Sequence, residues 1–461
     1  MTKSDVRILE AQPYFSVERA RVPLKFGGVV VEGVTFAHAR VRVENGAGRV
    51  ADGWGAIPLS DFWGWPSKVV AHDQRDAAMR LLVQECCTLA ARHGRFAHPV
   101  GIFQDLESEL ASSAAKISAK LALPEQIPYL AALICLSIID AAVHDAFGIA
   151  NGISTYDGYG SDFMPDLAQY LGPSFRSKYL NQFIQPTYKP WLPLFHLVGG
   201  LDKLRSSEVS ESDPQDGLPN SLDEWIAHDG LRCLKVKLSG KDLAWDLQRL
   251  LEVEAVAREA QAKLGIDELY LSADTNEQCE SPDYIVELLS KLREVRPSAY
   301  QALLYVEQPT ERDLNAHRFD MSPIAALKPV IIDESLITLE DFELAMQLNW
   351  SGIALKTCKC HTHALLFAAK AAQAGVPYTV QDLTNTGISL VHSVGLAARL
   401  NTLMGVEANS RQFFPASNAP EAAIHPNTFQ PVNGQVSTLT FGPTGLGYRI
   451  NEIARDIFIN R

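Results

Sequence analysis

Short apolar runs recur through the second half of the chain, and each carries charged or amide side chains near its C-terminal end. These runs, with their polar residues, are LKVKL (Lys235, Lys237), LYLSADTN (Asp274, Asn276), LLYVEQP (Glu307), PVIIDES (Asp333, Glu334), IALKTCK (Lys356) and YTVQDL (Gln381, Asp382). Unbroken apolar runs of this length are typical of parallel strands that are buried on both faces. Their charged residues follow one another at intervals of 23 to 37 residues, close to the roughly thirty residues of one β/α barrel unit.

Helical periodicity fills the segments between these runs. In residues 242–264, one face carries Leu243, Leu247, Leu250, Leu251 and Val256. Gly265 follows at the point where a helix would end. Alternation of strands and helices predicts a parallel β/α barrel. Because all barrel strands end at the same face, the polar residues of six strands should converge on one pocket.

Three of the predicted strand ends carry carboxylates, Asp274, Glu307 and Asp333, with no accompanying histidine or thiolate. An all-oxygen ligand set favours Mg²⁺, or Mn²⁺, over zinc. The pattern therefore predicts a divalent metal site. Salt bridges with a purely structural role are the alternative, although so many charges at the ends of buried runs are hard to justify without a ligand.

The lysines of the predicted pocket are candidate bases. Lys235 and Lys237 stand two residues apart, so both side chains point to the same face of a strand. Burial and mutual repulsion are expected to lower their pKa values towards the range of a neutral amine that accepts a proton. Lys356 should approach from the far side of the barrel. Such a site would remove a proton from the carbon alpha to a metal-bound carboxylate and stabilise the enediolate that results.

This set of residues resembles the enolase superfamily, and in particular its muconate-lactonizing-enzyme subgroup. The resemblance implies a modified TIM (β/α)7β barrel with an N-terminal α+β capping domain. It also implies Mg²⁺ held by Asp274, Glu307 and Asp333, and Lys237 and Lys356 as catalytic bases with Lys235 beside them. The mandelate-racemase subgroup places a histidine on the seventh strand, which YTVQDL lacks. The chain departs from the subgroup after Lys356, where a glycine pair is usual and CKCHTH stands instead.

On this comparison the chain divides into residues 1–189 (capping domain), 190–410 (barrel) and 411–461 (a C-terminal segment that packs back on the cap). Residues 6–69 alternate like strands, whereas residues 67–147 form three helical blocks broken near Gly94 and Pro124. The polar stretch 202–220 is either a long loop on the active-site face or a disordered insertion.

Substrate contacts are expected from both parts of the chain. The barrel should supply Asn276, Gln381, Asp382 and Glu407. In the capping domain, the resemblance points to two loops, residues 25–28 with Phe26 and residues 54–65 with Trp54. The tryptophans of the second loop either stack on the substrate or anchor the loop. The dipeptide-epimerase branch typically has Asp-x-Asp on the eighth strand, where this chain has Glu407, Ala408 and Asn409, which disfavours an amine-bearing dipeptide.

Other candidate sites are weaker. Cys358, Cys360, His361 and His363 could bind zinc or copper, but four ligands within six residues do not easily form a tetrahedron. Cys86 and Cys87 fit a buried helical block. His392, on a predicted helix, is expected to be a core or surface histidine.

Composition restricts the function classes. The chain has 461 residues, is 47% hydrophobic and carries a net charge of −13, which argues against nucleic-acid binding. Seven cysteines without paired spacing indicate a reducing compartment. The first residues lack a signal-peptide core. The apolar run 130–139 is interrupted by charged residues short of a membrane span. We therefore expect a cytoplasmic enzyme, a homo-oligomer, that acts on a small-molecule carboxylate without a membrane or nucleic-acid partner.

Three function classes remain open. The first is a racemase or epimerase. The second is a cycloisomerase or a lyase, such as a dehydratase or an o-succinylbenzoate-synthase-like enzyme, in which one lysine moves the proton and the other acts electrostatically. The third is a non-catalytic binding protein. The complete set of predicted bases and metal ligands favours the two enzyme classes.

Overall fold

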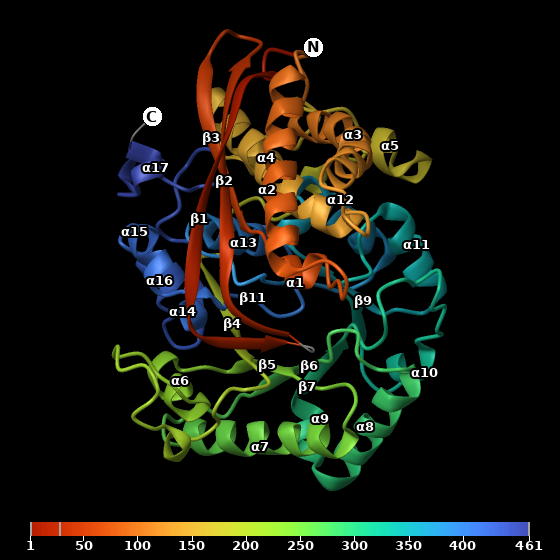
Figure 1. Cartoon of the computed structure of the whole chain (residues 1–461), viewed down its shortest axis with the longest axis vertical. Coiled ribbons are helices and arrows are strands. Elements are labelled where there is room, and N and C mark those ends of the chain that lie inside the picture. The colour runs from red at the N-terminus through yellow and green to blue at the C-terminus, as the bar shows by residue number, and fades with distance from the viewer. Residues whose placement is uncertain (1, 27–28, 460–461) are drawn as a thin grey trace.

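The computed structural model describes residues 2–26 and 29–459. Figure 1 shows an antiparallel sheet and its helices above a barrel, with the C-terminal segment along one side of both. The barrel has eight parallel strands and the cap is antiparallel, which confirms the predicted fold class.

The cap consists of one sheet and a layer of helices. Its strands, in the order β1-β2-β3, are β1 (Val6–Phe26), β2 (Val29–Asn45) and β3 (Val50–Pro58). Its helices are α1 (Asp61–Gly64), α2 (His72–Arg92), α3 (Pro99–Lys120) and α4 (Tyr129–Asn151). Alternate residues of β2, such as Val41 and Val43, are fully buried beneath these helices. The predicted strand segment and three helical blocks are therefore confirmed.

Helix α4 continues through the charged residues that were expected to end its apolar run. It spans 23 residues with a mean hydropathy of 1.8, and its apolar window is completely buried inside the protein. In the part of the chain that the structure describes, α4 alone is long and apolar enough to cross a membrane. Its burial between the cap sheet and the barrel makes it the central core helix of the upper layer.

Eight consecutive strands close the barrel, because β11 pairs with β4. These strands are β4 (Trp191–Val198), β5 (Cys233–Lys237), β6 (Tyr270–Asp274), β7 (Leu303–Glu307), β8 (Val330–Ile332), β9 (Gly352–Leu355), β10 (Tyr378–Val380) and β11 (Val406–Glu407). The connecting helices are α6 (Leu222–Asp229), α7 (Leu243–Ala262), α8 (Pro282–Val295), α9 (Pro297–Ala302), α10 (Ser322–Ala325), α11 (Leu339–Gln347), α12 (His361–Ala374) and α13 (Ile388–Ala398). The short helix α5 (Ala168–Leu171) lies in the linker before β4.

The C-terminal segment contacts both larger parts. Its elements are α14 (Ser410–Phe413), α15 (Ala419–Ala422), α16 (Pro426–Phe429), β12 (Gln435–Ser437) and α17 (Asp456–Ile459). Strand β12 pairs antiparallel with the start of barrel strand β4. In the cap, Asp145 of α4 accepts a hydrogen bond from Leu446 N at 2.8 Å, and the Phe458 ring lies 4.8 Å from that of Trp54. The segment thus ties the first barrel strand to the cap.

Candidate active site

The charged strand ends form one layer because neighbouring barrel strands are in register. Lys237 of β5 pairs with Asp274 of β6, which pairs with Glu307 of β7. Residues in register on adjacent parallel strands point to the same side of the sheet. Asp333 follows the last residue of β8 and Lys356 follows the last residue of β9. The predicted bases and metal ligands therefore meet at the C-terminal face of the barrel.

Lys235 lies at the centre of this layer and is 2% exposed. Its Nζ is 2.8 Å from Glu307 Oε1, 3.2 Å from Asp274 Oδ2 and 3.2 Å from Glu407 Oε2. It also donates to Gln381 Oε1 at 3.2 Å. A buried ammonium group with three hydrogen-bond acceptors and a further carboxylate beside it is fixed in place.

The other two predicted bases lie on opposite sides of the layer. Lys237 Nζ donates to Asp274 Oδ2 at 2.5 Å, and Lys356 Nζ lies 2.7 Å from Asp333 Oδ2. Lys356 also stands over the ring of Trp63, 4.5 Å from its centroid, in a cation–π contact. Strands β5 and β9 are four apart in the eight-stranded order, so the two amines approach from opposite walls.

A fourth lysine, Lys359, was not singled out from the sequence. It is 2% exposed, and its Nζ donates to the carbonyl oxygen of Asp333 and lies 3.1 Å from Asp333 Oδ1. Lys359 lies on the single helical turn that follows Lys356 after β9. Its spacing of three residues from Lys356 is the one sequence feature that could have placed it near the site. Asp333 is thus held by two ammonium groups.

The expected lowering of the lysine pKa is wrong for Lys235. Burial lowers the pKa of Lys235, but Glu307, Glu407 and Asp274 together raise it well above its usual value. Burial likewise lowers the pKa of Lys356, and Asp333, Glu307 and Glu334 together more than offset this, so the pKa is raised. The sequence argument counted the like charges and left out the carboxylates. Both amines are held as ammonium groups by their partners.

Negative charge exceeds positive charge in this layer. The buried carboxyl groups are Asp274, Glu307, Asp333, Glu334, Asp382 and Glu407, and the buried amines are Lys235, Lys237, Lys356 and Lys359. Six carboxylates against four ammonium groups leave a formal charge of −2. Burial, followed by repulsion from neighbouring carboxylates, raises the pKa values of Glu307 and Glu334. The pKa values of both partners in the Lys235–Glu307 ion pair therefore rise. Lys235 shares its positive charge among three carboxylates, so it does not offset the burial of Glu307 and the repulsion from its neighbours.

The donor set fits a hard divalent cation. Glu334 Oε2 and Asn276 Oδ1 are buried oxygen atoms that accept no hydrogen bond, and the three predicted ligands are all carboxylates. A divalent ion would also offset the formal charge of −2. Within residues 2–26 and 29–459, the carboxylate, imidazole and thiolate side chains form no ready cluster of three metal ligands, and lysines pair with Asp274, Glu307 and Asp333.

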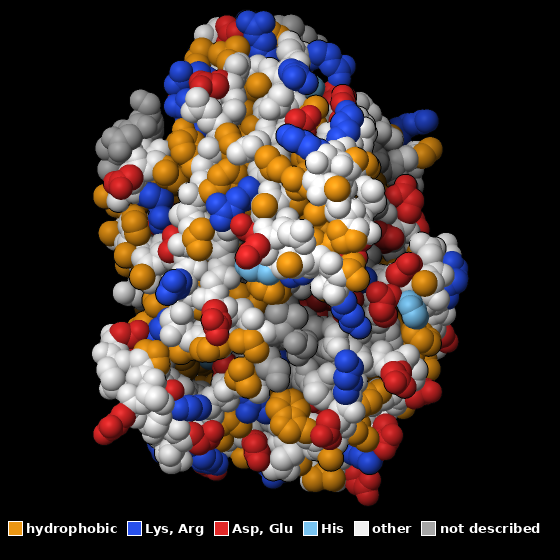
Figure 2. Space-filling model, in the orientation of Figure 1, with side chains coloured by type: hydrophobic (Ala, Val, Ile, Leu, Met, Phe, Trp, Pro, Cys, Tyr) orange, Lys and Arg blue, Asp and Glu red, His pale blue; other side chains and the backbone are white. Residues whose placement is uncertain are grey.

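A cavity of about 60 Å³ opens above the charged layer, between the barrel and the cap. Lys237, Lys356, Asn276, Asp382 and Glu407 line it. Burial, followed by repulsion from Glu407, raises the pKa of Asp382 to about 7. On the cap side the wall is apolar, with Leu24, Val31, Val34 and Trp63. Acidic and basic side chains are interspersed over the outer face in Figure 2, so the buried lysines supply the local positive charge for an anion.

Three predicted substrate contacts need comment. The predicted contact of Trp54 with the substrate is wrong, because this residue belongs to strand β3. Its 1% exposed ring packs 5.6 Å from the ring of Tyr14, among cap residues. Gln381 lies beneath the cavity and donates to Glu307 Oε2 at 2.5 Å. The side chain of Phe26 lies outside the described residues.

Trp63 is the tryptophan that reaches the cavity. The expected loop 54–65 consists of the end of β3 and helix α1, which turns Trp63 towards the barrel. Its Nε1 donates to Glu334 Oε1 at 2.9 Å. Trp65 instead anchors α1, and its Nε1 donates to Glu125 Oε1. The sequence placed a tryptophan at the site but could not distinguish these side chains.

The stretch after Lys356 has a structural role. His363 lies 2.9 Å from Glu107 and Cys360 contacts the carbonyl oxygen of Leu133, so the side chains diverge and form no metal site. Cys360 has φ of +75°, a conformation that favours glycine. This explains physically why a glycine is usual near this point. His392 is a buried core residue, as expected.

A chain of hydrogen bonds, the histidine network, joins this stretch to the cap. Its members are Asp140, His144, Tyr159, His361, Thr362 and His392. Thr362 O–H donates to Asp140 at 2.8 Å, so Thr362 must accept from His144 Nε2 at 2.9 Å. His144 Nδ1 therefore accepts from Tyr159 O–H.

The same reasoning continues along the network. The Tyr159 oxygen accepts from His361 Nε2 at 2.9 Å, and His361 Nδ1 accepts from His392 Nε2 at 2.8 Å. In this arrangement every hydrogen bond has one direction, with Nε2 of each histidine as the donor.

Comparisons with known proteins agree with this architecture. Residues 218–454, just over half of the chain, match the family described as Enolase C-terminal domain-like. No curated protein matches the sequence.

Three solved structures illustrate the likeness of fold. An enolase from Streptomyces coelicolor, a putative sugar isomerase, aligns with a TM-score of 0.64 and 16% identity over 99% of this chain and 96% of its own. N-succinyl Arg/Lys racemase from Bacillus cereus aligns at 0.63 and 15% over 98% and 97%. Muconate lactonizing enzyme from Pseudomonas fluorescens, complexed with muconolactone, aligns at 0.59 and 15% over 96% of each chain. These similarities extend over the cap as well as the barrel.

Proposed function

The chain belongs to the Enolase C-terminal domain-like family, and we propose that it removes the proton alpha to the carboxylate of a small molecule as a racemase or epimerase. One observation carries this proposal. Lys237 and Lys356 line the same cavity from strands β5 and β9, which stand opposite each other. A planar intermediate between them would present one face to each amine.

Asp274, Glu307 and Asp333 would hold Mg²⁺, or Mn²⁺, in this proposal. The ion, when bound, offsets the surplus negative charge of the site and stabilises the negative charge that develops on the substrate carboxylate. Glu334 and Asn276, each with a free buried oxygen atom, would complete the polar surroundings.

The lysines move the proton. The neutral amine of Lys237 takes the proton from the alpha carbon, and the electron pair of the broken C–H bond remains as the enediolate. The ammonium group of Lys356 then gives a proton to the opposite face, which inverts the centre. Trp63 and Asp333 hold Lys356 in position for this step.

A one-base reaction is the second candidate, either cycloisomerisation or elimination by a lyase. It is favoured by the contacts of Lys356, which pairs with Asp333 and lies over the Trp63 ring. Both contacts stabilise the ammonium form, so Lys356 would serve as a fixed positive charge beside the enediolate.

Hydrogen exchange in D₂O distinguishes the two candidates. Wild-type protein with Mg²⁺ is incubated with each enantiomer of N-succinylarginine, and deuterium at the alpha carbon is measured by NMR. If two bases operate, Lys356→Ala retains exchange on one enantiomer and Lys237→Ala on the other, and neither isomerises. If one base operates, only one variant retains exchange.

The matched control is Lys291→Ala, which alters an exposed lysine of α8 and should exchange at the wild-type rate. Exchange at wild-type rates on both enantiomers by both active-site variants would show that neither lysine is the base. Muconolactone, tested in the same way, extends the assay to lactones.

A further inference from the structure

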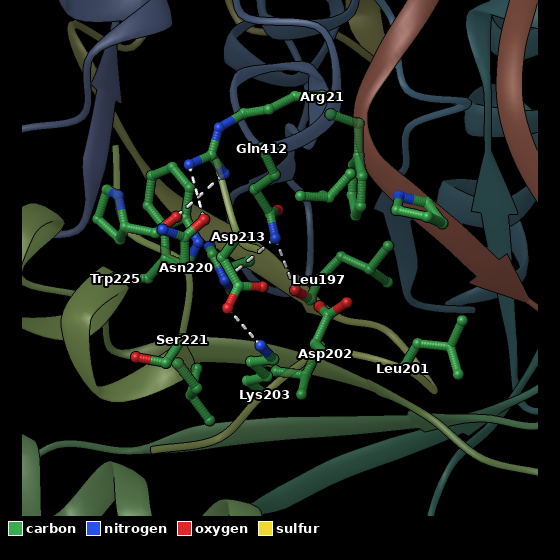
Figure 3. Close-up of a pocket in the computed structure, with 17 residues that line it drawn as sticks. Arg21, Leu197, Leu201, Asp202, Lys203, Asp213, Asn220, Ser221, Trp225 and Gln412 are labelled. Atoms are coloured by element: carbon green, nitrogen blue, oxygen red, sulfur yellow. Dashed lines mark hydrogen bonds and ion pairs between the residues drawn. The ribbon is translucent and has the colours of Figure 1, made fainter. Parts of the chain in front are cut away.

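A second cavity, of about 170 Å³, lies on the outer side of strand β4, between the barrel and the cap. Figure 3 shows residues from β1, β4, α6 and α14 and from the segment 201–221 around it. Leu197, Phe413 and Phe414 pack with Leu24 into one apolar cluster. This cluster contributes to the walls of both cavities and separates the second cavity from the lysines of the active site.

Arg21 of β1 forms one wall and holds the insertion 202–220 in place. Its Nε and Nη2 donate to the two carboxylate oxygens of Asp216 at 2.6 and 2.8 Å. Nη2 also donates to Asn220 Oδ1 at 2.9 Å. The insertion is therefore ordered against the cap, in place of the disordered alternative considered from the sequence.

The charged groups around this cavity already have hydrogen-bond or ion-pair partners. Arg21 pairs with Asp216, and Lys203 Nζ lies 2.5 Å from Asp213 Oδ2. Asp202 accepts a hydrogen bond from Gly199 N at 2.7 Å. Val22, Leu201 and Trp225 supply apolar surface. An occupant of this cavity would accordingly be uncharged, with carbon atoms against these three side chains.

The protonation of His196 is fixed by its neighbours. His196 is 2% exposed, and its Nδ1 accepts a hydrogen bond from Arg411 Nη2 at 2.7 Å. Arginine has no acceptor, so the histidine proton must be on Nε2. Burial, followed by the charge of Arg411, lowers the pKa of His196 well below its usual value, which keeps the ring neutral. Its Nε2–H group must donate.

The partner that faces this donor is unsuitable. Gln412 Nε2 stands 3.2 Å from His196 Nε2 and 2.9 Å from the carbonyl oxygen of Leu197. The amide nitrogen can donate to Leu197 but cannot accept from His196. If the amide is turned over, its oxygen accepts from His196 and then opposes the Leu197 oxygen. Gln412 Oε1 is also buried without a partner, although the side chain is only 3% exposed.

A hydroxyl group resolves both conflicts, because one oxygen atom can accept from His196 Nε2–H and donate to the Leu197 carbonyl. The Gln412 amide would then turn into the cavity and need a second hydroxyl group. We propose that this cavity binds a small uncharged molecule with at least two hydroxyl groups, seated on His196, Leu197 O and Gln412. Its volume suits on the order of six non-hydrogen atoms, at roughly 30 Å³ for each water-sized group.

Crystals of the wild-type protein soaked with glycerol provide the direct test. The expected result is a glycerol oxygen within hydrogen-bonding distance of both His196 Nε2 and Leu197 O, with the Gln412 amide turned to a second hydroxyl group. Density for water alone in the cavity, with Gln412 unmoved, would overturn the proposal.

Solution binding distinguishes a real site from filling at crystal concentrations. Saturation-transfer NMR titrations should give saturable glycerol binding and at least about fivefold weaker binding of 1-propanol, which has one hydroxyl group. Gln412→Leu should weaken glycerol binding by a similar factor and leave 1-propanol unchanged. Gln373→Leu, which alters an exposed glutamine of α12, is the matched control. Equal binding of both alcohols, or no saturable glycerol binding, contradicts the proposal, and neither measurement depends on enzymatic activity.

Discussion

The charged layer at the strand ends and the histidine network are two buried polar clusters on opposite sides of the stretch that follows β9. The network contains a single carboxylate, Asp140, whose two oxygens accept from Thr362, and each hydrogen bond described along it has one direction. The charged layer has two more carboxylates than amines and keeps buried oxygen atoms without partners. Burying unmatched charge costs stability, whereas a satisfied polar network contributes to it. The first cluster is therefore built to receive a ligand, and the second fixes the cap on the barrel.

The largest expected effect is on metal binding. Calorimetric titration of wild-type protein with Mg²⁺ should detect one site, and Asp274→Ala should weaken it more than about a hundredfold, because it removes a charged ligand. Saturating Mg²⁺ should also raise the unfolding temperature of the wild type, since the ion binds only the folded site. Asp283→Ala, at an exposed position of α8, is the control. Equal affinities of wild type and Asp274→Ala would remove the metal site from the proposed function.

Next in size is the loss of stability when the network is broken. Thr362→Val keeps the shape of the side chain but removes the hydroxyl group that accepts from His144 Nε2 and donates to Asp140 Oδ1, two atoms that lie 3.5 Å apart. The loss of these two hydrogen bonds should cost about 3 kcal/mol in the free energy of unfolding, measured by urea denaturation. Thr88→Val, on an exposed face of α2, should change it little. A loss below about 0.5 kcal/mol would show that the network is not a stabilising unit.

The network should also make stability depend on pH. Burial lowers the pKa of His392 from 6.5 to about 3. Its stabilising contribution is complete above pH 6.5 and is lost as the pH falls from 6.5 towards 3, because only the unfolded chain takes up the proton there. Between pH 7.5 and 5, wild type should lose about 2 kcal/mol more than His392→Gln, which keeps an N–H donor without titrating. If urea denaturation shows that the free energy of unfolding changes equally with pH in wild type and His392→Gln, this assignment is contradicted.

The smallest effect should have the opposite sign. Glu334→Gln removes one negative charge from a layer that has too many and keeps an oxygen to accept from Trp63 and Asn276. Without Mg²⁺, the variant should be more stable than wild type by about 1 kcal/mol. Glu294→Gln, an exposed change on α8, supplies the baseline for thermal melts. A less stable Glu334→Gln protein would mean that this carboxylate is fully compensated.

The barrel and its charged layer could be predicted from the sequence because both depend on local rules. Apolar runs and their spacing predicted the strands, and the register of parallel strands then brought Lys237, Asp274 and Glu307 side by side. The contribution of the cap could not be predicted in the same way. Trp54 and Trp63 differ in role because one lies in a strand and the other in the following helix, and only tertiary packing decides which ring meets Lys356.

The pKa values of the lysines could not be predicted for a related reason. Spacing showed that Lys235 lies near other lysines, but its actual neighbours come from β6, β7 and β11. The contacts of Arg21 with the insertion, nearly two hundred residues away in sequence, depend equally on the folded arrangement. The local sequence pattern therefore predicts which residues lie at the ends of the barrel strands. Contacts between segments distant in sequence determine their pKa values and hence their charge.

The packing of the last helix on the cap bears on how the protein is made. Phe458 lies against Trp54, and Leu446 N donates to Asp145 of the core helix α4. A ribosome exposes the cap sheet and its helices long before these residues, at about 5–20 residues per second. The N-terminal domain must therefore wait, with part of its apolar surface uncovered, for about 15 to 60 s while the barrel is synthesised.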